Sequence, residues 1–168
     1  MASFFSDETA LGYEPPRNTQ FNVFLDNRVG RLLELVEIFD GQALHMAGLS
    51  VMDATDHAVV RIVTSRAELA RRLLQRHSMP FHEVEVLVVE LGPGQSLTKL
   101  CKALVQAELN IYYAYPLLGR LHGGALVALH VDDLQLAGQI LRKKMFTLLA
   151  ENDLGDNATP GARGAAMA

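Results

Sequence analysis

The stretch Leu25–Phe39, LDNRVGRLLELVEIF, is the part of the sequence on which the predicted fold depends. It completes an alternating segment, FNVFL at 21–25, which is typical of a strand. Asp26 and Asn27 then offer side chains that cap helices well, and Gly30 stands just before an apolar run. The spacing of that run predicts a helix with one apolar face, formed by Leu32, Leu33, Val36 and Phe39.

A strand, a glycine and a helix in this order often form a phosphate site, so a nucleotide site is the first alternative. A dinucleotide fingerprint needs G-x-G-x-x-G, and a P-loop needs G-K-[ST]. The chain contains neither motif, since Gly92-Pro93-Gly94 lacks a third glycine at the required place. Gly30 is left with two interpretations: a plain turn glycine, or the point where another small ligand approaches the backbone.

The order of predicted elements occurs twice along the chain. Strands are expected at 21–25, 43–54, 57–63 and 82–91, with the last long enough for two, and a second helix follows Thr64-Ser65. After a loop at 92–96 the series continues with a helix from Leu97, strands at 109–118 and 124–131 around a turn at 119–123, a helix capped by Asp132 or Asp133, and a short strand at 145–149. A shift of 65 residues keeps the apolar positions in step, because it aligns Leu32 with Leu97 and Leu44 with Leu109. The predicted fold class is α+β: two tandem ferredoxin-like βαββαβ units, with antiparallel sheets and helices on one face.

Composition sets the limits of the domains. The chain has 168 residues, of which 49% are hydrophobic, enough for one domain or two small ones. The expected division is a flexible N-terminal segment at 1–19, unit 1 at 20–84, unit 2 at 85–150, and a flexible C-terminal tail at 151–168 that is rich in Gly, Ala, Asn and Asp. The N-terminal residues lack the basic start and apolar core of a secretory signal.

The repeated turn resembles that of the ACT domain, a small ligand-binding module of regulators in amino-acid metabolism. The resemblance rests on Asp26-Asn27-Arg28-Val29-Gly30-Arg31-Leu32-Leu33, on the helix that follows, and on Glu108-Leu109-Asn110-Ile111-Tyr112-Tyr113 in the second unit. It covers about residues 20–150 as two tandem copies. The chain departs from the family pattern at Val29, where proline is common, and in the second turn, which is one residue longer.

The resemblance implies that an effector, commonly an amino acid, binds at a seam where the strand-to-helix turn of one unit faces the second strand of another. The first implied site pairs Asp26, Asn27, Arg28, Val29 and Gly30 with Ile111, Tyr112, Tyr113 and Ala114. The second, whose longer loop departs from the pattern, pairs Gly92, Pro93, Gly94, Gln95 and Ser96 with Met46, Ala47, Gly48 and Leu49.

The chemistry of the first turn suits such a ligand without the family. The N-terminus of a helix presents unpaired N–H groups and the positive end of a dipole, which attract a carboxylate. The side-chain oxygen of Asp26 or Asn27 would accept hydrogen bonds from the ammonium group of an amino acid.

Other chemistries have weaker support. None of the six histidines stands at metal-ligand spacing from another, so no metal or cofactor is expected. Cys101, the single cysteine, falls on an apolar helical face without a catalytic partner and is interpreted as a buried thiol. Alternation puts Tyr113 and Tyr115 on one face of a strand, where they serve either sheet packing or the seam.

These observations predict a non-catalytic, cytoplasmic regulatory protein that binds an amino acid or a similar small metabolite. Exposed sheet edges make a homodimer plausible. The net charge of −4 and the short apolar runs argue against nucleic acid and membrane as partners. The alternative is a structural or regulatory subunit that dimerises or docks on a biosynthetic enzyme without a ligand. An enzyme of the same fold is the third possibility, for which no acid/base pair can be nominated.

Overall fold

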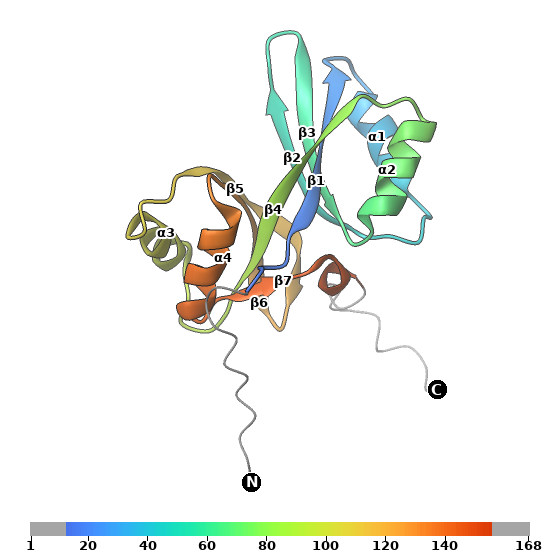
Figure 1. The fold of residues 1–168 in the computed structure, drawn as a ribbon. Coiled ribbons are helices and arrows are strands. Elements are labelled where there is room, and N and C mark those ends of the chain that lie inside the picture. The colour runs from blue at the N-terminus through green and yellow to red at the C-terminus, as the bar shows by residue number, and fades with distance from the viewer. Residues whose placement is uncertain (1–12, 156–168) are drawn as a thin grey trace, which may run out of the picture.

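The computed structural model describes residues 13–155 of the chain (Figure 1). The predicted element order is confirmed. Within the described residues the elements are β1 (Asn18–Asp26), α1 (Arg31–Phe39), β2 (Met46–Asp53), β3 (His57–Thr64), α2 (Ala67–Arg76), β4 (Phe81–Leu91), α3 (Leu97–Val105), β5 (Ile111–Leu121), β6 (Gly124–Val131), α4 (Leu134–Lys143), β7 (Thr147–Leu149) and the 3₁₀ helix η1 (Glu151–Leu154).

The two βαββαβ units share one strand. All strand pairs are antiparallel, in the order β2-β3-β1-β4-β6-β5, with β7 also paired to β4. The first half of β4, up to Val86, pairs with β1, and the second half, from Leu87, pairs with β6. The predicted boundary at 84/85 therefore falls inside a continuous strand, which closes the sheet of unit 1 and opens that of unit 2.

Alternation along β4 separates three cores. Phe81 packs with the helices of unit 1, whereas Leu87 and Val89 pack with the helices of unit 2. Val86 and Val88, which point to the opposite side of the strand, lie in a third cluster between the units. Side chains alternate along a strand, so each unit has two different sheet faces. One face is covered by the helices of that unit, and the other packs against the sheet of the other unit. Figure 1 accordingly shows α1 and α2 apart from α3 and α4, with the strands between the two helix pairs.

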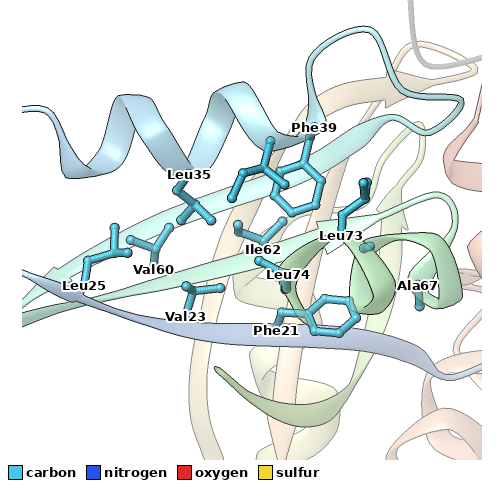
Figure 2. Close-up of a cluster of buried hydrophobic side chains, with 12 residues drawn as sticks. Phe21, Val23, Leu25, Leu35, Phe39, Val60, Ile62, Ala67, Leu73 and Leu74 are labelled. Carbon is cyan, nitrogen blue, oxygen red and sulfur yellow. The ribbon is translucent and has the colours of Figure 1, made fainter. Parts of the chain in front are cut away.

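The core of unit 1 follows from its sequence pattern. Phe21, Val23 and Leu25 alternate along β1 and point toward the helices, where Leu35 of α1 and Leu74 of α2 meet them (Figure 2). Burial of such apolar side chains is the main favourable contribution to folding, at about 25 cal/mol per Å².

The predicted apolar face of α1 is wrong in part. Leu35, Ile38 and Phe39 are buried, whereas Leu32 and Leu33 are 39% and 60% exposed. Apolar residues surround much of this helix, so its spacing is compatible with two overlapping apolar faces. The orientation of the helix on the sheet decides which of these faces is buried. Leu32 and Leu33 remain at the surface.

Two other boundaries differ from those expected. β5 continues to Leu121, so the predicted turn at 119–123 shrinks to His122 and Gly123, which adopt positive φ angles of 47° and 85°. Residues 151–154, within the predicted C-terminal tail, form η1, and Leu154 is fully buried between the units. The parts of the predicted flexible ends at 1–12 and 156–168 lie outside the described residues.

No helix within residues 13–155 is long and apolar enough to cross a membrane.

Candidate functional site

The first turn, residues 26–30, is exposed and sharply bent. Asp26 ends β1 and forms an ion pair with Arg28 at 2.9 Å, and the Asn27 amide donates to Asp53 at the end of β2 at 3.1 Å. Val29 projects fully into solvent. Gly30 has φ +90°, a left-handed conformation that glycine adopts without strain, and it turns the chain into α1.

The N-terminus of α1 differs from those of the other three helices. Ser96 accepts the Lys99 N–H of α3, Asp133 accepts the Leu136 N–H of α4, and Glu151 accepts the Ala67 N–H of α2. No side chain among the described residues caps α1. The Arg31 N–H donates to the Arg28 carbonyl oxygen at 3.3 Å, and the Glu34 N–H donates to that of Gly30 at 3.0 Å. Among the described residues, no acceptor faces the N–H groups of Leu32 and Leu33, which are thus open to solvent or to an outside carboxylate.

The other half of the first predicted site, residues 111–114, lies on the edge strand β5. Ile111 packs into the core of unit 2, and Tyr112 is 58% exposed, with its ring 5.3 Å from that of His130. Tyr113 points to the opposite side, toward unit 1, and Ala114 is exposed. The Tyr113 ring stacks on that of Tyr115, with centroids 6.4 Å apart, so these two tyrosines share one face, as predicted.

Within one chain these two halves do not meet. Figure 1 shows the turn between β1 and α1 at the far end of unit 1, well away from β5. The described contacts of the turn run to β2 of its own unit, whereas Tyr113 contacts Gln20 and Arg61 near the middle of the molecule. The pairing remains a prediction, and it requires a second copy of the chain.

The second predicted site is divided in the same way. Its turn contains five residues between strand and helix, against four in the first turn, in agreement with the longer loop expected there. Gly92 N–H donates to Gln95, whose amide donates to the Met145 carbonyl oxygen at 2.8 Å after α4. The backbone of Gly94 has φ +73°, and Pro93 is exposed.

The strand opposite this second turn packs elsewhere. Met46 and Leu49 contact the core of unit 1, and Ala47 lies between the units. A Cβ atom at Gly48 would stand 2.4 Å from Leu117 Cδ2 of β5, so a larger residue there would have to displace the Leu117 side chain. The role of Gly48 in one chain is packing.

A polar cluster joins the units through the face of the sheet. Gln20 is fully buried, and its Nε2 donates to Tyr113 Oη at 2.8 Å and to Asn22 Oδ1 at 2.7 Å. Tyr115 Oη donates to Gln20 Oε1 at 2.7 Å. The Arg61 guanidinium lies over the Tyr113 ring, with Cζ 3.8 Å from its centroid, a favourable cation–π geometry.

Burial raises the pKa of the Tyr115 hydroxyl above its usual range; nearby Tyr113 adds to this, and Arg61 opposes it. The hydroxyl therefore stays protonated and acts as the donor that Gln20 Oε1 needs. Gln20 and Arg61 are not among the site residues that the sequence predicts. Both occupy alternate positions on strands where a polar side chain is expected to face water, so no local signal marked them.

Two open cavities on unit 1 lie away from the first turn, and a third, of about 550 Å³, begins at Arg31 beside it. One, of about 450 Å³, lies between α1 and the start of β2, and Met46 of the second predicted site lines it. Another, of about 590 Å³, lies between Leu44, Arg66 and Asn152. Within residues 13–155, no group of three or more His, Cys, Asp or Glu side chains is placed to hold a metal ion.

Comparison with known proteins supports the fold. A family model described as an ACT domain pair matches residues 17–158. The structure is similar to that of protein BT0572 from Bacteroides thetaiotaomicron, with a TM-score of 0.72 and 23% identity over 83% of this chain and 96% of the other. The ligand-free regulatory subunit of aspartate kinase from Thermus thermophilus gives a TM-score of 0.53 at 10% identity, over 79% and 93% of the two chains. Among curated proteins, none matches the chain.

Proposed function

Because the chain belongs to the family of ACT domain pairs, whose fold is regulatory, we propose that it is a non-catalytic, cytoplasmic sensor of an amino acid or a similar small metabolite. The observation that carries this proposal is the uncapped N-terminus of α1 behind Gly30. The open N–H groups suit the ligand's carboxylate. The side chains of Asp26 and Asn27, at the same turn, suit its ammonium group.

A second copy of the chain would complete the site. The first turn and residues 111–114 are apart in one chain, so the seam between them forms in a homodimer. Leu32 and Leu33 on α1, and Tyr112 and Leu118 on the edge strand β5, are exposed apolar side chains that such an interface would cover. A closed dimer would present each pair of halves twice.

Ligand in the seam would act by population shift. It would order the first turn and favour the arrangement of units in which both halves of the site are in contact. A metabolic enzyme that binds one arrangement better than the other would respond to the ligand through this difference in affinity.

The fold likeness to an aspartate kinase regulatory subunit favours one alternative: a subunit that dimerises or docks on a biosynthetic enzyme without binding a ligand itself. The two functions differ in one observable. A sensor is stabilised by its metabolite in the absence of any partner, whereas a purely structural subunit is not.

The first prediction concerns Val29. We expect one of the common amino acids, at millimolar concentration, to raise the melting temperature of the full chain, and calorimetry to give its affinity. Val29→Glu should weaken that affinity by about tenfold or more, because a carboxylate fixed beside the helix N-terminus competes with that of the ligand. The folded chain should tolerate the change, since Val29 is fully exposed.

Val29→Gln is the matched control, with the same size and no charge, and it should bind as the natural chain does. Stabilisation by none of the amino acids, or equal binding by the Glu and Gln variants, would contradict the proposed site.

A further inference from the structure

One end of unit 2 combines exposed apolar and cationic side chains. The start of α3 and the end of α4 meet there, because the Gln95 amide donates to the Met145 carbonyl oxygen at 2.8 Å. Leu97 is 49% exposed and Met145 is 81% exposed. Lys99, Lys143 and Lys144 stand beside them in the sequence and are exposed. These five residues are called the α3–α4 end.

The lysines of this end lack carboxylate partners within the described part of the chain. Within residues 13–155, the one side-chain hydrogen bond of these three lysines runs from Lys99 Nζ to the Gly94 carbonyl oxygen, at 2.6 Å. The helices of unit 1 differ, since Arg31 pairs with Glu34, and Arg71 pairs with Glu68 and Glu83. Helices α3 and α4 contain no Asp or Glu at all. Lys99, Lys143 and Lys144 are therefore available to an outside partner.

The turn that holds Met145 does not need a methionine. Met145 N–H donates to Arg142 O and Phe146 N–H to Leu141 O; in unit 1, Ser78 N–H donates to Gln75 O and Met79 N–H to Leu74 O. Met145 and Ser78 have similar left-handed φ angles, 65° and 53°. Unit 1 thus forms the same turn with a serine. The exposed methionine of unit 2 contributes a flexible apolar side chain without a structural requirement for it.

The opposite end of the same helices is acidic. Glu108 follows α3 and Asp132-Asp133 precede α4, and these segments meet where Asn110 N–H donates to Asp132 Oδ1 at 3.1 Å. An extended polyanion lying along the helices would meet the lysines at one end and be repelled by the carboxylates at the other. A compact acidic partner at the α3–α4 end would meet cations alone.

We propose that the α3–α4 end is a docking surface for an acidic protein segment that carries an apolar side chain. Leu97 and Met145 would form the apolar centre and the lysines the charged rim, which is the usual anatomy of a protein interface. Complementary charge would steer the partner to this end and exclude basic surfaces. This surface is separate from the first turn and does not depend on a ligand there.

The test uses the full chain and a glutamate-rich synthetic peptide with one central leucine. Fluorescence anisotropy should show binding that weakens with salt, and amide NMR shifts should change at residues 97–99 and 143–145. A peptide with serine in place of the leucine should bind about tenfold more weakly, as expected when one buried apolar side chain is lost.

Variants locate the binding. Met145→Ser, which copies the turn of unit 1, should fold normally and bind the leucine peptide about tenfold more weakly. Lys143→Glu with Lys144→Glu should weaken binding by tenfold or more. Arg76→Glu, at the position of α2 that corresponds to Lys143 of α4, is the matched control and should bind as the natural chain does.

Three results would overturn the proposal. Equal binding of the leucine and serine peptides would remove the apolar centre. Tighter binding of an oligothymidine of equal charge would assign the surface to nucleic acid. Self-association that is abolished by Lys143→Glu with Lys144→Glu would assign it to a second copy of the chain.

Discussion

At the scale of single residues, the junction of the two units depends on Gln20. A buried amide is unfavourable unless its donor and acceptor are both satisfied. Gln20 meets this condition only because Tyr113 and Tyr115 of β5 reach it across the sheet. The cluster therefore favours one placement of the units over slightly shifted ones, because a shift would break its hydrogen bonds. Apolar contacts depend less on exact position and would distinguish these placements less well.

We predict that Tyr115→Phe lowers the free energy of unfolding by about 1–3 kcal/mol, because it leaves the buried Gln20 Oε1 without a donor. Urea unfolding measures this, with Tyr112→Phe, at an exposed position, as the control that should change little. An unchanged midpoint for Tyr115→Phe would show that water satisfies Gln20 instead.

The same tyrosine predicts a pH dependence. Its pKa is raised in the folded chain, whereas in the unfolded chain it is about 10. The unfolded state thus loses the proton first, and the stability that is fully present below pH ~10 falls as the pH rises further. Unfolding measured between pH 9 and 11 should show a steeper loss for the natural chain than for Tyr115→Phe; parallel curves would contradict this.

At the scale of elements, the C-terminal 3₁₀ helix η1 holds unit 1 to the end of unit 2. Arg66 precedes α2 and its side chain makes no capping bond, so the Ala67 N–H is satisfied by Glu151, 84 residues away. Leu154 is fully buried against both units. This contact explains why part of a segment with the composition of a flexible tail is folded.

We predict that Glu151→Ala lowers the free energy of unfolding by about 1 kcal/mol, the usual effect of losing a helix N-cap. Glu151→Gln should retain most of the stability, since its amide oxygen still accepts the Ala67 N–H. Hydrogen exchange at Ala67 should accelerate in the alanine variant only. Equal exchange in both variants would exclude this capping role.

At the scale of the whole molecule, the two units share a strand and a buried cluster, so we expect them to unfold together. β4 belongs to both sheets, and the cluster between the units draws side chains from β2, β3, β4, β5, β6, β7 and η1. A unit that unfolded alone would expose backbone groups of β4 and the side of this cluster that remained folded. The expected behaviour is a single cooperative transition.

We predict that Leu35→Ala, deep in unit 1, lowers the free energy of unfolding by about 2–5 kcal/mol through cavity formation. The free energy of opening that native-state hydrogen exchange reports for β6 of unit 2 should fall by the same amount. Leu118→Ala, at a position that is 67% exposed, is the control. Unchanged protection of Leu126–Leu129 in the Leu35 variant would show that the units unfold independently.

The element order, the two-unit plan and the unequal lengths of the two turns were predictable from the sequence, because they depend on local patterns. Strand alternation, helix spacing and glycine in a left-handed turn are properties of neighbouring residues. The apolar face of α1 was not predictable in this way, since Leu32, Leu33 and Leu35 fit overlapping helical faces equally well.

By itself, the sequence determined two βαββαβ units and a first turn with the chemistry of a carboxylate site, since hydrophobic period and turn chemistry act over a few residues. Only the tertiary structure decided that one strand serves both units, that Glu151 caps α2, and that Gln20 meets Tyr115. These contacts join residues far apart in the sequence, by 84 positions for Glu151 and Ala67 and by 95 for Gln20 and Tyr115, and they depend on the twist and packing of the whole sheet. For the same reason, only the fold separates the two halves of the first predicted site within one chain.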